Sequence, residues 1–534
     1  MKIPFSISRF SRLVLLFMAL LFVVTTVLFL GKGQLNFFNA TCIAVGCLII
    51  SNYCIGIKRD TIIITLLMLL GIICTIGLSK LYIDLTFDGQ AYHQEMIIQM
   101  SNGWNPIYEE ISATNNQSIW LNHYAKGYEV IGAVFYSILG KITIVKFLNL
   151  VFLGLSFLYP FNYFKTIKSK STAFLLALVI ALNPVTLSQL MTNLIDGFLY
   201  AVVVVTLFSY LQSKNKKTYL FDFTLGIILL VNIKFTGLVY AVILYGVLFL
   251  YEMFVEKVKS KTLVKRTVVV AILMLPFLIM PYLKNFSEKG HPFYPLMGEN
   301  NIDFVEDYVP DVLKEKGRLE KLLFTNFVSV GNRSDSFLKI PFSFSFNELQ
   351  KMRNGAPRVG SLGVWWGGIL LVSILFYLYA IFRERKRFTL SVYEVIIGVI
   401  LFLLIVNKAG WWLRYTPFVW TIPLLLYLSI SRYKNLKNEL KILGALALVN
   451  AGFTVMVSLG LRYSDSKSFI SKLEDLKNTN EIIHVDFGAY LGNKALFLEY
   501  GIQFKERSST GFKSSKLFNN VVVIDQKLEL NNEE

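Results

Sequence analysis

The chain has 534 residues, of which 53 are Lys or Arg and 35 are Asp or Glu, so its formal net charge is +18. Hydrophobic residues make up 54% of the sequence and charged residues only 16%, against roughly 25% in soluble domains. A soluble protein of this composition would expose large apolar patches. The composition excludes disordered, collagen-like and disulfide-scaffold chains, and it predicts an all-α polytopic membrane protein.

Thirteen apolar stretches are close in length to what a helix needs to cross the hydrocarbon layer, which is about 20 residues. The first is too long for the core of a signal peptide and lacks a small-residue cleavage site, which predicts a retained anchor. Together they predict a transmembrane domain over 1–461. The predicted spans are 12–31, 36–56, 61–84, 142–162, 171–190, 194–211, 218–232, 235–254, 267–283, 361–382, 391–407, 413–430 and 442–461.

The distribution of Lys and Arg predicts the orientation, because cytoplasmic loops carry the excess of positive charge. With the N-terminus inside, the predicted inner segments hold 24 Lys and Arg residues, whereas the short outer loops hold Lys32, Lys234, Lys408 and Arg414. An odd number of spans then places the C-terminus outside. The positive net charge is thus explained by topology, and nucleic-acid binding is not expected.

Three long segments fall on the predicted outer side: a first loop at 85–141, a large loop at 284–360 and a soluble C-terminal segment at 462–534. The C-terminal segment contains strand-like runs at 481–487 and 521–524. The inner loops are too short for a nucleotide-binding domain and contain no phosphate-binding glycine-rich loop. An ATP-driven pump and a cytoplasmic nucleotide-sugar enzyme are therefore disfavoured.

The first outer loop opens on an acidic cluster, with Asp84 and Asp88 at the exit of the third span. A carboxylate at such an exit lies in a half-dry environment that suits a general base. If the helix continued, the two acids would share one face and could hold a divalent cation. The alternative is that both acids only mark the water boundary. The alternation of residues 90–101 predicts a short helix lying in the membrane interface.

Further polar residues stand at predicted outer helix ends, and snorkelling to water is the alternative explanation for Lys234 and Arg414. Lys126 is the only cation of 85–140 and could pair with phosphate or be a solvated surface charge. All seven Trp residues map to the outer half, which predicts a cavity with aromatic walls suited to sugar rings and an isoprenoid chain. The outer polar residues are Tyr92, His93, Lys126, Asp196, Lys234, His291, Tyr294, Arg358 and Arg414.

Three short motifs resemble those of the GT-C superfamily of integral-membrane glycosyltransferases, which includes protein O-mannosyltransferases and lipid A aminoarabinose transferases. The motifs are Phe87-Asp88-Gly89-Gln90-Ala91-Tyr92-His93, His291-Pro292-Phe293-Tyr294-Pro295 and Arg414-Tyr415-Thr416-Pro417-Phe418. The resemblance implies transfer of a sugar from a polyprenyl-phosphate carrier to a glycan, lipid or protein acceptor. It also implies a bacterial inner membrane, with Asp88 as the catalytic base on the periplasmic or exterior face.

The expected chemistry agrees with these residue types. An acceptor hydroxyl that attacks an anomeric carbon needs a base, and polyprenyl phosphate leaves as a stable anion that needs cations. A single displacement would invert the anomeric configuration. Many GT-C members carry an adjacent acidic pair, whereas here the second acid is four residues away, so a divalent cation at Asp84 and Asp88 stays open and no other cofactor is expected. The donor- and acceptor-binding set would be Asp84, Tyr92, His93, Lys126, Asp196, Lys234, His291, Tyr294, Arg358 and Arg414.

Two alternatives remain from the residues alone. A lipid-linked glycan polymerase or ligase would perform related chemistry but would depend on outer-loop Arg and His side chains. A lipid-linked oligosaccharide flippase would perform none, and it should carry ionisable residues at the middle of the membrane within paired repeats.

Overall fold

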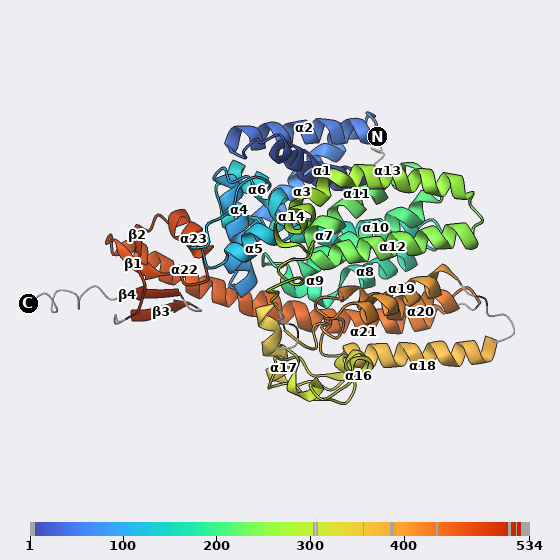
Figure 1. Cartoon of the computed structure of the whole chain (residues 1–534). Helices are drawn as coiled ribbons and strands as arrows, with labels where there is room; N and C mark the ends of the chain where they lie inside the picture. Colours follow the sequence, from blue (N-terminus) through green and yellow to red (C-terminus); the bar gives the residue numbers. More distant parts are fainter. Residues whose placement is uncertain are drawn as a thin grey trace, which may run out of the picture.

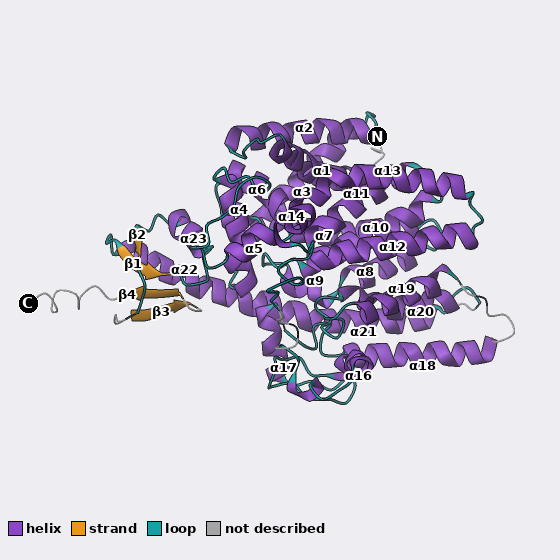
Figure 2. Ribbon diagram, viewed as in Figure 1, coloured by secondary structure: helices purple, strands orange, loops and turns teal. Residues whose placement is uncertain are grey.

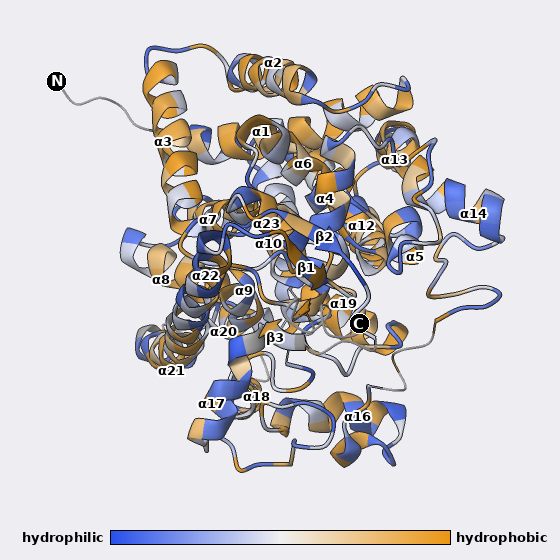
Figure 3. Ribbon diagram, turned by 90° about the vertical axis from the view of Figure 1, so that its left-hand side faces the viewer, coloured by the Kyte–Doolittle hydropathy of each residue, from blue (hydrophilic) through white to orange (hydrophobic). Residues whose placement is uncertain are grey.

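The computed structural model describes residues 6–302, 305, 308–355, 357–384, 389, 391–433, 436–510, 514–518 and 521–524. Helices dominate these residues, and the strands lie together in a small unit that projects from one end of the helix bundle (Figures 1 and 2). The helices of the bundle are mainly hydrophobic, while α17 and α22 are largely hydrophilic (Figure 3).

The first half of the chain supplies most of the bundle. Its helices are α1 (Ile7–Leu30), α2 (Phe37–Ile55), α3 (Thr61–Ser79), η1 (Gly89–His93), α4 (Gln94–Ser101), α5 (Ser118–His123), α6 (Gly127–Leu139), η2 (Ile142–Ile144), α7 (Phe147–Phe164), α8 (Lys170–Ala181), α9 (Pro184–Gln189), α10 (Asp196–Ser213), α11 (Thr218–Ile233) and α12 (Phe235–Phe254).

The second half completes the bundle and adds the loops at its end. Its elements are α13 (Ser260–Leu278), η3 (Ile279–Leu283), α14 (Lys284–Lys289), η4 (Asp311–Leu313), α16 (Arg318–Phe324), η5 (Thr325–Phe327), α17 (Phe346–Lys351), η6 (Met352–Asn354), α18 (Trp366–Glu384), α19 (Val392–Val406), η7 (Pro417–Thr421), α20 (Ile422–Ile430), α21 (Lys437–Val455), η8 (Met456–Leu461), α22 (Arg462–Asn478), β1 (Ile483–Asp486), α23 (Asn493–Glu499), β2 (Phe504–Glu506), β3 (Ser514–Phe518) and β4 (Val521–Ile524).

Each of the thirteen predicted spans coincides with helix in the structure. Among the described residues, nine helices are long and apolar enough to cross a membrane. The other four predicted spans correspond to shorter apolar helices within α8, α11, α19 and η7–α20. A fifth short apolar helix, α6, lies inside the segment predicted as an outer loop. The polytopic helical class is therefore supported, while the number of crossings and their orientation stay predictions.

The predicted span 171–190 is broken in the middle, and the break shapes the site. The side chain of Asn183 accepts hydrogen bonds from the backbone N–H groups of Val185 (2.8 Å) and Thr186 (3.3 Å), which starts a new helix at α9. Pro184 follows at the first helical position, where its missing N–H costs nothing. The chain then turns after Gln189 and enters α10 at Asp196.

The helix expected over 90–101 is present as η1 and α4, while its place in the membrane interface stays a prediction. Its polar residues Gln90, His93, Gln94 and Glu95 are all buried in the protein. The helix packs against α6, whose apolar face accounts for this burial. The apolar residues that alternate along 90–101 therefore contact protein rather than lipid.

The C-terminal unit consists of α22, α23 and a four-stranded sheet in the order β2-β1-β4-β3. β1 pairs with β2 in parallel and with β4 antiparallel, and β4 pairs antiparallel with β3. The strands confirm the two strand-like runs predicted at 481–487 and 521–524. α22 continues from α21 through the turn η8, so one long helix joins this unit to the bundle.

Candidate functional site

A cavity of about 1060 Å³ lies where several helix ends of the bundle meet the C-terminal unit. Its walls come from the turn before η1, the starts of α10 and α12, the segment 293–302 with Val305 and Tyr308, and the 406–415 loop. Its charged lining residues are Asp88, Asp196, Lys234, Arg353, Arg358, Lys408, Arg414, Arg462 and Asp465. Segments more than 300 residues apart in the chain thus share one cavity.

Arg414 is the centre of the charged group. Its Nη2 donates to Asp88 Oδ2 at 3.0 Å, and its Nε lies 2.8 Å from Asp196 Oδ2 in an ion pair. Lys234 Nζ donates to the second oxygen of Asp196, Oδ1, at 2.9 Å. Two cations and two carboxylates therefore alternate along one wall of the cavity. The side chain of Asp88 is 28% exposed and that of Asp196 is 2% exposed, so only the first faces open space.

The position of Asp196 is fixed by the break between α9 and α10. Gln189 Nε2 donates to Asp196 Oδ2 at 3.0 Å, and Gln189 Oε1 accepts from the N–H of Gly197 at 2.8 Å. Asp196 is also the first residue of α10, where the partial positive charge of the helix N-terminus favours a carboxylate. A Cβ on Gly197 would lie 2.7 Å from the Cα of Thr186, so the close approach of α9 requires glycine. Asp196 is therefore held as a rigid anchor for the two cations.

Lys234 stands in extended backbone between α11 and α12, at a helix end as expected. Its Nζ lies 3.5 Å from the centre of the Tyr415 ring, within cation–π distance. The Arg414 guanidinium lies 5.1 Å from the same ring. The Tyr415 ring thus lies near both cations that pair with Asp196. Because both cations are buried and paired, the alternative that they snorkel to water does not hold.

Asp88 directly precedes the π-helical turn η1. A Cβ on Gly89 would overlap Asp84 Oδ2 and Thr86 Oγ1, so only glycine fits after Asp88. The expected shared helix face of Asp84 and Asp88 is wrong, because α3 ends at Ser79 and the chain is not helical again until the residues next to Asp88. The two carboxylates are therefore not stacked on one helix.

Asp84 lies behind the cavity wall instead of in it. Its Oδ1 accepts from the N–H and Oγ1 of Thr86 at 3.0 and 2.7 Å, and its Oδ2 accepts from the N–H of Asn193 at 2.6 Å. These bonds tie the turn before Asp88 to the turn before α10. A cation shared by Asp84 and Asp88 does not fit this arrangement. Within the described ranges, the chain has no group of three or more His, Cys, Asp or Glu side chains that could hold a metal ion.

Aromatic side chains form the wall next to Asp88. The rings of Tyr92 and Trp120 stack with centroids 5.9 Å apart, and Tyr124 meets Trp120 edge-on at 5.9 Å. Burial raises the pKa of Tyr92 and of Tyr124 well above the ordinary value, so both hydroxyls stay protonated and can donate. Of the seven Trp residues, Trp120 and Trp412 line the cavity, which supports part of the predicted aromatic lining.

His93 follows on the same turn and also lines the cavity. Its Nδ1 is hydrogen-bonded to Glu129 of α6, whose side chain is completely buried. This carboxylate fixes the orientation of the imidazole. Glu129 was not predicted as a site residue, although an acid inside the apolar run 127–139 indicates a buried partner.

Arg358, a cation of the predicted binding set, also lines the cavity. Its guanidinium carbon lies 3.8 Å from the centre of the Tyr308 ring, and Tyr308 packs edge-on against Trp412 at 6.0 Å. Among the residues that the structure describes, no carboxylate lies within 4.0 Å of the Arg358 nitrogens. Its charge therefore remains available to an anion in the cavity.

Besides Asp84, three predicted site residues do not line the cavity. Lys126 is buried and donates to the carbonyl of Tyr124 at 2.7 Å, and its burial lowers the pKa to about 7. Tyr294 packs edge-on against His123 at 4.9 Å, and His291 accepts from the N–H of Phe293 at 3.2 Å. The His-Pro-Phe-Tyr-Pro motif thus supports the wall through Phe293, which does line the cavity.

A second charged group in the cavity was not predicted from the sequence. Arg353 pairs with Asp465, and Arg462 Nη2 donates to the carbonyl of Arg353 at 2.6 Å. Tyr490 of the C-terminal unit completes the lining. These residues come from the large outer loop and the C-terminal segment, and no local pattern in the sequence could connect them.

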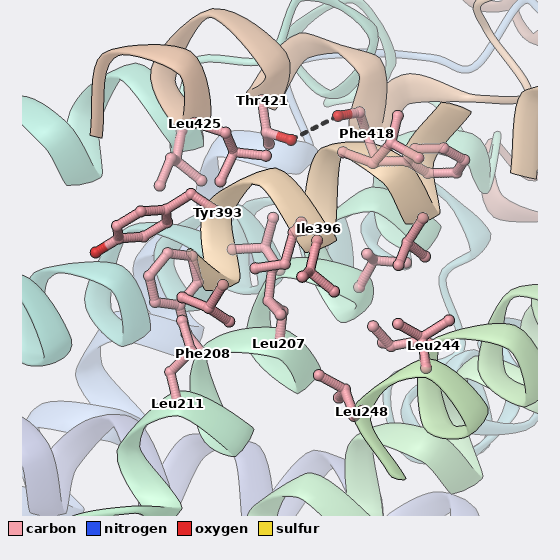
Figure 4. Close-up of a pocket in the computed structure, with 18 of the residues that line it drawn as sticks. Leu207, Phe208, Leu211, Leu244, Leu248, Tyr393, Ile396, Phe418, Thr421 and Leu425 are labelled. Atoms are coloured by element: carbon pink, nitrogen blue, oxygen red, sulfur yellow. Dashed lines mark hydrogen bonds between the residues drawn. The ribbon is translucent and has the colours of Figure 1, made fainter. Parts of the chain in front are cut away.

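A separate apolar pocket lies between α10, α12, α19 and α20 (Figure 4). Leucine, isoleucine and aromatic side chains line this pocket. The hydroxyl of Thr421, which also lines it, donates a hydrogen bond to the carbonyl oxygen of Phe418 at 2.7 Å. Tyr240 borders both this pocket and the charged cavity. A polar space and an apolar space therefore adjoin at one residue.

No family model matches the chain, and no curated protein matches it. A solved oligosaccharyltransferase from Archaeoglobus fulgidus, tethered with an acceptor peptide containing the NVT sequon, is similar to it with 14% sequence identity. The alignment covers 84% of this chain and has a TM-score of 0.35. The chain spans 61% of the length of that structure. At this TM-score the likeness carries no functional inference for this chain.

Proposed function

We propose that the protein is a membrane glycosyltransferase that moves a sugar from a polyprenyl-phosphate carrier to an acceptor hydroxyl on the extracytoplasmic side. The observation that carries the proposal is the group of Asp88, Asp196, Lys234 and Arg414 on one wall of a cavity large enough for a sugar and its phosphate. These are the residue types that a base and a leaving phosphate require.

In the proposed reaction, the acceptor hydroxyl gives its proton to the exposed carboxylate of Asp88. The acceptor oxygen forms a bond to the anomeric carbon while the bond from that carbon to the phosphate oxygen breaks. Polyprenyl phosphate leaves with both bonding electrons, and because the acceptor attacks the face opposite to it in a single step, the displacement inverts the anomeric configuration. Arg414, Lys234 and Arg358 supply positive charge to this leaving group, and guanidinium groups suit phosphate because they bind it through two N–H groups.

The two adjoining spaces suit a carrier of mixed polarity. The aromatic faces of Trp120, Tyr92 and Trp412 suit the apolar face of a sugar ring. The apolar pocket beyond Tyr240 offers a surface for the isoprenoid chain next to the membrane-facing helices (Figure 4). A lipid-linked sugar would thus place its phosphate between the two spaces.

The experiment uses the purified full chain in lipid nanodiscs with a panel of short-chain polyprenyl-phosphate sugars and candidate glycan, lipid and peptide acceptors. Release of free polyprenyl phosphate together with a new glycosidic bond is the expected result. A parallel liposome assay follows movement of the intact donor between leaflets. Translocation without cleavage of any donor would contradict the proposal and favour the flippase, and growth of one product by repeated units would favour the polymerase.

A further inference from the structure

The C-terminal unit contacts the turn that carries Asp88. The N–H of Gly492 donates to the carbonyl oxygen of Gln90 at 2.8 Å. The side-chain amides of Gln90 and Asn493 exchange two hydrogen bonds of 3.2 and 3.3 Å. Each of these two side chains is 1% exposed, so the pairing is shielded from water. Gln90 is only two residues from Asp88 along the chain.

The contact leaves no spare room. A Cβ on Gly492 would overlap Gln94 Oε1 and lie 3.1 Å from the carbonyl oxygen of Gln90. The φ angle of Gly492 is −58°, which any residue adopts, so a side chain at this position would be disfavoured only by space. A side chain there displaces the Gln94 amide and also crowds the Gln94 Cβ at 3.0 Å and the Gln90 carbonyl, so the C-terminal loop and the end of η1 and start of α4 have to shift slightly apart.

A second contact holds the other neighbour of Asp88. The rings of Phe87 and Tyr490 meet edge-on with centroids 5.4 Å apart, and Tyr490 also lines the cavity. Asp88 therefore lies between one residue that packs on Tyr490 and a turn that is bonded to Gly492 and Asn493. Both contacts come from the short stretch 487–493 after β1.

The C-terminal unit also has an independent anchor on the bundle. The carboxylate of Glu499, at the end of α23, accepts from the backbone N–H of Ile142 and from Thr143 Oγ1 at 3.1 Å. This anchor lies outside the stretch 487–493. The unit can thus stay attached when the contact with η1 is altered, which separates a local effect from loss of the whole unit.

We propose that the stretch 487–493 is a positioning element that keeps Asp88 in register with Arg414. A π-helical turn holds one residue more than a regular helical turn and persists only where its surroundings support it. Without the bond from Gly492 and the amide pair with Asn493, η1 can relax to a regular helix. Because one residue corresponds to about 100° of helical rotation, the relaxation would turn the Asp88 carboxylate away from Arg414.

The first test measures position without activity. Cys42, Cys47, Cys54 and Cys74 are replaced by alanine, Asp88→Cys is introduced, and its labelling by a membrane-impermeant maleimide is timed. A thiol close to Arg414 is favoured as the reactive thiolate. Adding Gly492→Val should therefore slow labelling roughly three-fold or more. Asn493→Ala, which adds no volume, should slow it less, and the exposed control Leu498→Ala should leave it unchanged.

The second test rests on the proposed function. With a donor that the wild type consumes, Gly492→Val and Asn493→Ala should lower kcat roughly ten- to hundred-fold, with little change in the donor KM. An unchanged labelling rate in both variants overturns the positioning role, whatever the activity. The expected labelling change in a protein that transfers no sugar overturns the proposed function and leaves the positioning role standing.

Discussion

The two ends of the helix bundle both carry buried ion pairs, but they use them differently. At the end where α12 turns into α13 (Figure 1), Arg12 donates to Asp222 through Nε at 2.9 Å and Nη2 at 3.0 Å, and Tyr159 donates to the same carboxylate at 3.0 Å. The Asp222 side chain is 0% exposed and lines neither the cavity nor the apolar pocket. We call this group closed, because the Asp222 carboxylate is fully buried and is paired with Arg12 and Tyr159.

At the other end, the carboxylate of Asp88 shares Arg414 with Asp196 and keeps 28% of its side chain exposed to the cavity. A closed pair stabilises the bundle, whereas an open pair offers groups to a ligand. Burial of charge alone therefore does not identify a ligand-binding site in this fold. The site is distinguished by a charged group in which Asp196 is buried and held in place, while Asp88 is partly exposed to the cavity.

Replacing the open carboxylate should have the largest effect. Asp88→Asn removes the proton acceptor and should lower kcat by roughly 10²–10⁴-fold. The thermal unfolding midpoint in detergent should change little, because Asp88 is half-exposed and Arg414 keeps Asp196. Steady-state transfer assays and a thiol-reactive unfolding dye measure the two quantities. Full transfer activity in this variant would contradict the role of Asp88.

The closed pair should give the opposite pattern. Asp222→Asn leaves the Arg12 guanidinium buried without its carboxylate and should lower the free energy of unfolding by about 3–5 kcal/mol. Activity per folded molecule should stay at the wild-type level. The control Asp311→Asn, at an exposed ion pair, should leave the unfolding midpoint unchanged. Loss of activity without loss of stability in Asp222→Asn would remove the distinction between the two ends.

Arg414 tests how the open group is held together. In Arg414→Lys, a single ammonium cannot present one donor to Asp196 and another to Asp88 in the fixed fork of a guanidinium. The donor KM should rise roughly ten-fold, since one tenfold step corresponds to about 1.4 kcal/mol of lost binding. An unchanged KM with the donor that the wild type consumes would mean that Arg414 does not contact the phosphate.

The smallest expected effect comes from replacing Lys126, which should change how the stability of the protein depends on pH. It is a closed cation near the cavity, and because burial lowers its pKa to about 7, the unfolded chain binds the proton more tightly. Below pH 7 the buried Lys126 ammonium therefore destabilises the folded state. The free energy of unfolding rises between about pH 7 and pH 10, by up to about 1.4 kcal/mol per pH unit. Lys126→Met should remove that slope. Unfolding midpoints between pH 6 and 9 measure it, and identical slopes would contradict the burial of the charge.

The helices could be predicted from the sequence because each apolar run is a local signal, and all thirteen predicted stretches are helical. Asp196, Lys234 and Arg414 stand near helix ends, as expected from the places where apolar runs begin or end. The spacing of Asp84 and Asp88 predicted a shared helix face wrongly, because it assumes a continuous helix and residues 84–86 are not helical. An i, i+4 rule applies only after the helix itself is established.

The rest of the site depends on contacts between distant segments. Glu129 beside His93, Gln189 beside Asp196, and Gly492 beside Gln90 are pairs that only the tertiary fold creates. Lys126 illustrates the converse, because the lone cation of the first outer loop is turned inward to a backbone carbonyl. A sequence lists the groups available for chemistry, but the fold decides which of them face the cavity.

The most direct measurement is a cryo-electron-microscopy map of the wild type in nanodiscs with a non-hydrolysable phosphonate analogue of the donor that it consumes. The account predicts a phosphonate in contact with Arg414, Lys234 and Arg358, a sugar against the aromatic wall, and the anomeric carbon within reach of a hydroxyl held by Asp88. Density for the analogue outside the charged cavity, with these four side chains paired as in the free protein, would contradict it.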